Sequence, residues 1–140
     1  MIIIDTNVIS ELWKTKPNPN VLAWIDAQAV ETLYLSAITV AELRYGLATM
    51  PEGKRRTIYQ DRLEGEVLPA FTARVLPFDL DASQAYADLM ARARVGGKAI
   101  GKEDGYIAAI ANARGFIVAT RDVAPFRAAG LSTINPWEAT

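Results

Sequence analysis

The chain contains neither cysteine nor histidine among its 140 residues. Without cysteine it can form no disulfide and has no thiolate nucleophile. Without histidine it has no imidazole base, no Ser-His-Asp triad and no zinc site built from thiolate or imidazole ligands. Any acid–base chemistry must therefore come from Asp, Glu, Lys, Tyr or a metal-bound water. The absence of cysteine is also compatible with a reducing compartment, and we expect a cytoplasmic protein.

A strong net charge and a long hydrophobic run are missing as well. The formal net charge is −1, so a nucleic-acid partner would have to be held by local patches or through a metal. No apolar run approaches the ~20 residues of a membrane span, and the first residues lack the basic segment of a secretory signal, so we expect no membrane association. A hydrophobic fraction of 51% over 140 residues instead predicts a single domain, residues 1–140.

Short apolar runs alternate along the chain with longer segments of helical character. The runs predict strands at Ile2–Ile4, Leu33–Leu35, Val75–Phe78, Phe116–Ala119 and Leu131–Ile134. Capping residues and spacing predict helices at Thr6–Leu12, from Asn18-Pro19 onward, from Ser36 to about Met50, at Lys54–Leu68, from Asp81 or Ser83 to Gly96, at Lys102–Arg114, and from Asp122 to about Ala128. This order predicts a three-layer α/β fold with a mainly parallel sheet and helices on both faces. Pro77 places the third strand near an edge.

Four carboxylates occupy positions that suggest a shared pocket. Asp5 and Asp122 follow strands, and Asp104 lies in the first turn of a helix. Ligands of open α/β folds bind at the carboxyl edge of the sheet, where such residues meet. Glu42 lies inside a helix, on a face that we interpret as largely apolar, and an ionised Glu there is costly unless it is paired or binds a metal. Neither position 38 nor position 46 offers it a basic partner.

Each acid also has a local explanation. Asp5 and Asp122 could simply cap helices, Asp104 could complement a helix dipole, and Glu42 could face solvent if the helix phase is shifted. The four together are less easily explained in this way. Two carboxylates ~5 Å apart repel by about 3 kcal/mol at an effective dielectric constant of ~20, so a cluster must hold protons or recruit cations. Oxygen ligands favour Mg²⁺ or Mn²⁺, which predicts hydrolysis of a phosphodiester by a metal-activated water.

Two further groups of residues lie beside this predicted pocket. Polar neighbours that could orient the carboxylates or a metal-bound water are Thr6, Asn7 and Thr120. Cations that could meet substrate phosphates are Arg121, Lys98 and Lys102. Local capping explains the first group equally well, and surface solvation explains any single cation. Lys54–Arg56 is interpreted as the solvated face of a helix, and the tryptophans as core or interface residues.

The same residues carry a resemblance to a known family. The motifs are Asp5-Thr6-Asn7-Val8, Ser36-Ala37-Ile38-Thr39-Val40-Ala41-Glu42-Leu43, Asp104-Gly105-Tyr106-Ile107-Ala108-Ala109, Ala119-Thr120-Arg121-Asp122 and Asn135-Pro136-Trp137. In this order they resemble PIN-domain proteins, in particular the VapC/FitB group of bacterial toxin–antitoxin ribonucleases. The resemblance spans essentially the whole chain, and the ordered set is specific although no single motif is.

The resemblance implies a PIN-like fold with strand order 3-2-1-4-5 and RNA cleavage that depends on Mg²⁺ or Mn²⁺. The family's acidic positions correspond to Asp5, Glu42, Asp104 and Asp122, and its ordered hydroxyl corresponds to Thr120. The resemblance also implies a homodimer and a small antitoxin protein that blocks the pocket. Such antitoxins are often ribbon-helix-helix DNA-binding proteins, so operator DNA would be contacted through the antitoxin.

The sequence suggests three functions. The leading hypothesis is an endoribonuclease toxin in which metal-activated water attacks in line and leaves a 5′-phosphate and a 3′-hydroxyl. The second is a partner that strengthens an antitoxin's grip on DNA and has little nuclease activity; the intact set of four acids argues against it. The third is a signalling receiver domain, but the acids follow the wrong strands for a receiver and Glu42 would have no role in one.

Overall fold

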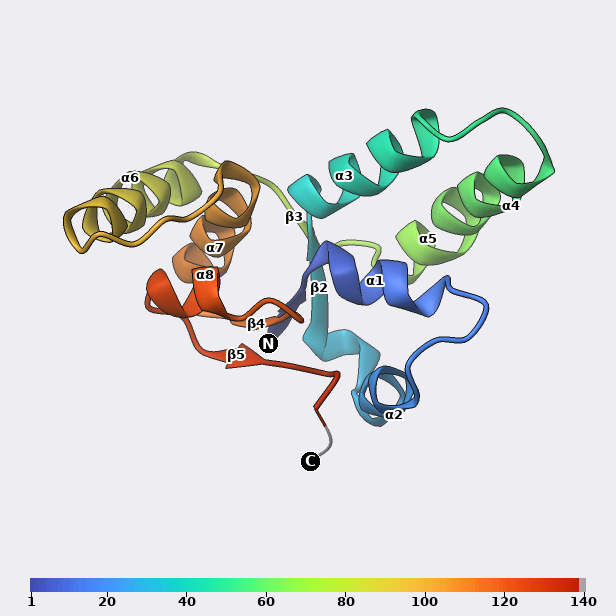
Figure 1. Cartoon of the computed structure of the whole chain (residues 1–140), viewed down its shortest axis with the longest axis horizontal. Coiled ribbons are helices and arrows are strands. Elements are labelled where there is room, and N and C mark those ends of the chain that lie inside the picture. The colour runs from blue at the N-terminus through green and yellow to red at the C-terminus, as the bar shows by residue number, and fades with distance from the viewer. Residues whose placement is uncertain (139–140) are drawn as a thin grey trace.

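The computed structural model of the chain describes residues 1–138, which contain one five-stranded sheet (Figure 1). The strands are β1 (Ile2–Ile4), β2 (Leu33–Ser36), β3 (Val75–Leu76), β4 (Ile117–Ala119) and β5 (Thr133–Ile134). They lie in the order β3-β2-β1-β4-β5, and each neighbouring pair is parallel. The predicted fold class and strand order are confirmed, and β3 lies at an edge as Pro77 indicated.

Helices connect the strands and cover both faces of the sheet. Their bounds are α1 (Thr6–Leu12), α2 (Pro19–Ala27), the 3-10 turn η1 (Val30–Thr32), α3 (Ala37–Ala48), α4 (Lys54–Arg62), the π-helical segment η2 (Leu63–Val67), α5 (Leu68–Ala70), α6 (Leu80–Val95), α7 (Lys102–Arg114) and α8 (Ala124–Ala128). In Figure 1, α6, α7 and α8 lie to one side of β1 and β2, and α1, α4 and α5 to the other. Among residues 1–138, no helix has the length and apolar character needed to cross a membrane.

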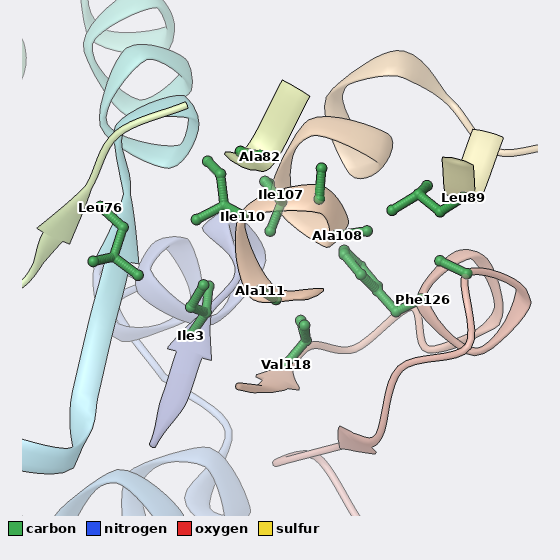
Figure 2. Close-up of a cluster of buried hydrophobic side chains, with 12 residues drawn as sticks. Ile3, Leu76, Ala82, Leu89, Ile107, Ala108, Ile110, Ala111, Val118 and Phe126 are labelled. Carbon is green, nitrogen blue, oxygen red and sulfur yellow. The ribbon is translucent and has the colours of Figure 1, made fainter. Parts of the chain in front are cut away.

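The core consists of two clusters, one on each face of the sheet. Alternation along β1 sends Ile3 into the first cluster and Ile4 into the second. Figure 2 shows the first cluster, in which Phe126 of α8 and Leu89 of α6 pack around the apolar side of α7. The second is formed by buried side chains of α1, α2, α3 and η2 over β1 and β2. The two clusters enclose the central strand β1 between layers of helices.

Local sequence signals fix several helix ends. The Asn18 side chain accepts from the amide of Asn20 and caps α2, and the Ser36 hydroxyl accepts from the amide of Thr39 and caps α3. Gly115 ends α7 with φ 71°, in the left-handed region that glycine adopts without strain. These ends are where the sequence predicted them.

Two helix starts differ from the prediction. Helix α6 begins at Leu80 and not at Asp81 or Ser83, because Asp79 is the cap and its Oδ1 accepts from the amide of Ala82 at 2.9 Å. Helix α8 begins at Ala124 and not at Asp122, and Pro125 occupies its first turn. In both cases a nearby residue supplied a better start signal than the one chosen from the sequence.

The predicted helix Lys54–Leu68 is longer and less regular in the structure. Helix α4 passes into η2 and then into α5, so the helical path reaches Ala70. Pro69, the residue after the predicted end of the helix, lies in the first turn of α5, where its missing N–H costs no intrahelical hydrogen bond. The π-helical segment changes the phase of the helix just before the proline and makes this placement possible.

Candidate functional site

Three elements deliver polar residues to the carboxyl edge of the sheet. Strand β1 ends at Ile4, and Asp5 then caps α1. The Asp5 amide donates to the carbonyl of Ala119, so the ends of β1 and β4 lie side by side. Thr120 follows β4 directly, and Ser36 ends β2 and starts α3. The central position of β1 therefore places Asp5 between the residues that leave the neighbouring strands.

Two clefts open at this edge. The first has a volume of about 420 Å³, and its lining includes Asp5, Glu42 and Asp104. The second has a volume of about 660 Å³ and is lined in part by Asp104 and Asp122. Asp104 therefore lies on the border between the two. Three of the four predicted acids meet in one cleft, and the fourth, which is exposed, lies in the adjoining one.

Thr120 is the centre of a hydrogen-bond network around Asp5. Its buried hydroxyl donates to Asp5 Oδ2 at 2.8 Å. The Thr120 hydroxyl oxygen in turn accepts from Asn7 Nδ2 at 3.3 Å and from the Asp122 amide at 3.2 Å. The other carboxylate oxygen of Asp5 accepts from the Thr6 amide at 2.7 Å. One hydroxyl thus links the first acid of the chain with the segment that carries the last.

A second network holds Glu42. The Thr6 hydroxyl donates to Glu42 Oε1 at 2.9 Å and lies 3.1 Å from the buried hydroxyl of Thr39. The expectation that Glu42 lies on an apolar helix face is wrong, because Tyr45 is 72% exposed and Gly46 is also at the surface. Glu42 instead lies at the border between core and solvent. Its carboxylate accepts the hydrogen bond from Thr6 and lines the first cleft.

The acids raise one another's pKa values. Burial raises the pKa of Asp5, hydrogen bonds from Thr120 and Thr6 oppose that rise, and the charges of Glu42 and Asp122 add to it. Burial is also the main cause that raises the pKa of Asp104 to about 6, and the charges of Asp5, Asp122 and Glu103 contribute further. The pKa of Glu42 is raised by burial and by the charges of Asp104 and Glu103, against the hydrogen bond from Thr6. The carboxylates therefore form one electrostatically coupled group.

Sequence reasoning missed several residues of this site. Glu103 adds a fifth carboxylate to the coupled group, and its place beside Asp104 in the first turn of α7 was the available signal. The wall of the first cleft also includes Ser10, Glu11 and Lys14. Together with Asn7 they recur at positions i, i+3, i+4 and i+7, so a polar stripe on α1 and its C-terminal extension could have revealed them.

The predicted cations are placed differently from one another. Arg121 lines the first cleft, and its guanidinium lies 5.3 Å from the centre of the Trp137 ring, which also lines that cleft. Lys98 lines the second cleft together with Asp104 and Asp122. Lys102, in the first turn of α7, lines neither cleft. The structure thus brings Arg121 and Lys98 to the acidic edge and leaves Lys102 outside both hollows.

The donor set fits a hard divalent cation. The acids of the cleft offer carboxylate oxygens, and such ligands suit Mg²⁺ or Mn²⁺. Among residues 1–138, however, no three acidic side chains converge closely enough to hold one ion by themselves. An ion here would complete its shell with waters or substrate oxygens, which is how Mg²⁺ is usually bound.

Comparison with known proteins agrees with this geometry. The sequence matches the PIN-domain family over residues 2–131. It is 75% identical to the VapC ribonuclease Y4jK of Sinorhizobium fredii over 138 residues, which is 99% of each chain. It is 48% identical to the toxin FitB of Neisseria gonorrhoeae over 137 residues, covering 98% of this chain and 99% of FitB. A solved structure described as FitAB bound to an IR36 DNA fragment matches with a TM-score of 0.97 and 46% identity, over 100% of this chain and 98% of that one.

These matches cover nearly the whole chain, and the solved structure shares its architecture. The chain therefore belongs to the PIN-domain family, and within that family to the VapC/FitB group. The resemblance inferred from the sequence motifs is confirmed, and the receiver-domain alternative is excluded.

Proposed function

We propose that the chain is a metal-dependent endoribonuclease and the toxin of a toxin–antitoxin system. The observation that carries the proposal is the meeting of Asp5, Glu42 and Asp104 in one cleft, with pKa values raised by burial and by one another's charge. A relative that is 75% identical is named a VapC ribonuclease, and one that is 48% identical is named a toxin. Identity at these levels over full length supports a shared activity.

Each residue has a role in this proposal. Asp5, Glu42, Asp104 and Asp122 hold one or two Mg²⁺ or Mn²⁺ ions at the carboxyl edge of the sheet. When bound, the metal would offset phosphate charge and lower the pKa of a water, which makes hydrolysis possible without histidine. Thr120 and Thr6 orient Asp5 and Glu42 through the hydrogen bonds described above. Arg121, held against Trp137, contacts a substrate phosphate at the cleft.

The partners of the protein are part of the same proposal. A complex described as FitAB bound to DNA shares this fold at 46% identity, which supports a small antitoxin protein as partner and operator DNA contacted through it. We propose that the antitoxin covers the acidic cleft and that the toxin acts as a homodimer in the cytoplasm. The runner-up function, a DNA-complex partner with little nuclease activity, is also compatible with that complex.

The decisive experiment is RNA cleavage by the purified protein with Mg²⁺, with EDTA and with the Asp5→Asn variant. Cleavage is expected to need Mg²⁺ and to fall about a hundredfold or more in Asp5→Asn, because an acidic ligand is lost. Asp26→Asn is the matched control, since Asp26 is an exposed acid on α2. Equal cleavage by Asp5→Asn, or in EDTA, would contradict the proposal. Growth that continues on expression without antitoxin, combined with tight operator binding by the complex, would favour the runner-up.

A further inference from the structure

A third hollow, whose lining is basic, lies next to the first cleft, which we call the acidic cleft. It has a volume of about 490 Å³, and its lining includes Lys14, Lys54, Arg55 and Arg62 together with the rings of Trp13 and Tyr59. Among residues 1–138, no acidic side chain lines it. We call this hollow the basic groove. The lining of the acidic cleft, in contrast, contains Asp5, Glu11, Glu42 and Asp104.

The basic groove presents flat groups as well as charge. The guanidinium carbons of Arg55 and Arg62 each lie 5.6 Å from the centre of the Tyr59 ring. On α4 these arginines precede Tyr59 by four residues and follow it by three, so all lie on one helix face. Trp13 stacks on Tyr59 with ring centres 5.9 Å apart and an interplanar angle of 20°, and the Tyr59 hydroxyl donates to the Trp13 carbonyl at 3.3 Å. These planar groups form a surface on which a base can stack.

The charges of this groove are mostly unneutralised. The ion pairs among residues 1–138 are Lys14–Glu11, Arg44–Glu64 and Arg114–Asp79. Lys54, Arg55 and Arg62 therefore have no acidic partner in the part of the chain that the structure describes. Cations of this kind attract phosphates and release counterions on binding. The sequence favoured a merely solvated helix face for Lys54–Arg56, but α4 brings Lys54 and Arg55 together with Arg62, Tyr59 and Trp13.

The basic groove is continuous with the acidic cleft through Lys14, which lines both. The Lys14 ammonium is held by Glu11 Oε1 at 2.8 Å, and Glu11 is buried in the wall of the acidic cleft. A chain that leaves the acidic cleft along the C-terminal end of α1 would thus pass Lys14 and enter the groove. Without a metal the acidic cleft repels a polyanion, so the metal-free protein must draw its affinity for RNA from neighbouring cations.

We propose that the basic groove binds the single-stranded RNA segment next to the scissile phosphodiester, an inference that rests on the proposed function. Lys14, Lys54, Arg55 and Arg62 contact backbone phosphates, and an unpaired base stacks on the outer side of the planar cluster that Trp13, Tyr59 and the two guanidinium groups form. Duplex RNA keeps its bases paired and offers none to this cluster. An acidic peptide would satisfy the cations but would make no use of the stacked rings.

The test measures RNA binding without cleavage. Fluorescence anisotropy of a labelled single-stranded RNA of mixed sequence is followed over a range of salt concentrations, with metal-free Asp5→Asn protein as parent. Adding Arg55→Gln and Arg62→Gln is expected to weaken binding about tenfold at low salt. It should also reduce the slope of log affinity against log salt by about 1.4, because each phosphate contact contributes about 0.7.

The matched control carries Arg92→Gln and Arg94→Gln, which remove the same charge from α6. Helix α6 lies on the opposite side of the sheet from α4 (Figure 1), so the control should bind like the parent. Equal affinity and equal salt slope in the two double variants would overturn the proposal. So would tight binding of poly-glutamate through the same arginines, since the groove would then serve an acidic protein. Because binding is measured alone, a chain that fails to cut RNA can still pass this test.

Discussion

At the scale of single residues, burial and hydrogen bonding shift the pKa of Asp5 in opposite directions. The residue is only 6% exposed, and burial favours the protonated acid. Two donors, the Thr120 hydroxyl and the Thr6 amide, favour the ionised form at the same carboxylate. Thr120 therefore does more than fill space in the core. It opposes the effects of burial and of the charges of Glu42 and Asp122.

Replacing Thr120 by Val tests this role because the two side chains have nearly the same shape. Thr120→Val leaves Asp5 Oδ2 and the Asp122 amide without their partner, at a cost of about 1–3 kcal/mol in unfolding free energy. The pKa of Asp5 should rise further, so the pH profile of RNA cleavage moves to higher pH and the rate falls about 10–100-fold. Denaturant melts and a pH–rate profile provide the measurements.

Thr120→Ser is the control, since it keeps the hydroxyl and loses only a methyl group. It should cost about 1 kcal/mol and leave the pH profile in place. If Thr120→Val cleaved RNA with the same pH profile as Thr120→Ser, the hydrogen bond to Asp5 would have no part in the activity.

The sequence pointed to the acids that line this site, but it did not predict their surroundings or their contacts with one another. Asp5 and Asp122 could be found because each follows a strand, and Asp104 because it starts a helix. The reason given for Glu42 was wrong, since helix phase cannot tell whether a face meets core, cleft or solvent. Glu103 was missed, although its place beside Asp104 in the first turn of α7 is visible in the sequence. That its charge also raises the pKa of Glu42 depends on how α7 packs near α3, which the sequence does not show.

At the scale of elements, the contact between α6 and α7 positions Asp104. Gly105 follows Asp104 on α7, and a Cβ there would lie 2.9 Å from Met90 Sδ and 3.1 Å from Tyr86 Cε2. The Met90 side chain can move, but the Tyr86 ring is stacked on Tyr106 at a centre distance of 4.9 Å. The absence of a side chain at 105 therefore allows the close approach that sets where α7 begins and where Asp104 points.

Gly105→Ala is expected to destabilise the protein by about 1–3 kcal/mol despite the better helix propensity of Ala. It should also lower RNA cleavage, because any shift of α7 moves Asp104. Gly46→Ala on α3 is the matched control, since nothing lies within 4 Å of its added Cβ. The control should gain up to about 1 kcal/mol. Denaturant melts measure the unfolding free energy of the two variants. Equal stability would show that the α6–α7 contact can accommodate a methyl group at position 105.

Most helices and strands could be predicted from the sequence. The differences lie at helix ends and in the segment that contains Pro69. The strands and the caps at Asn18 and Ser36 follow from short-range signals. The helical path through Pro69 was not predicted, because a π-helical segment precedes the proline and no local signal in the sequence marks it.

At the scale of the whole molecule, the coupled carboxylates make stability depend on pH when no metal is bound. The folded-state pKa values of Asp5, Glu42 and Asp104 are all raised. A raised pKa gives stability that is fully present below the ordinary pKa and is lost as pH rises through the folded value. For Asp104 that loss spans the interval from 3.8 to about 6. A cation bound to the cluster would reverse it, which ties folding to metal binding.

Asp104→Asn isolates this effect in metal-free protein. Between pH 3.8 and about 6, the parent should lose unfolding free energy relative to the variant. The difference should reach about 1 kcal/mol after allowance for solvent screening of a partly exposed group. Glu11 and Glu64, whose pKa values are lowered, give the opposite slope at low pH, but they are common to both proteins and cancel in the difference. Urea melts in EDTA across this range measure it. Parallel profiles for the two proteins would mean that Asp104 ionises in the folded state as freely as in the unfolded chain, and that it lies outside the coupled group.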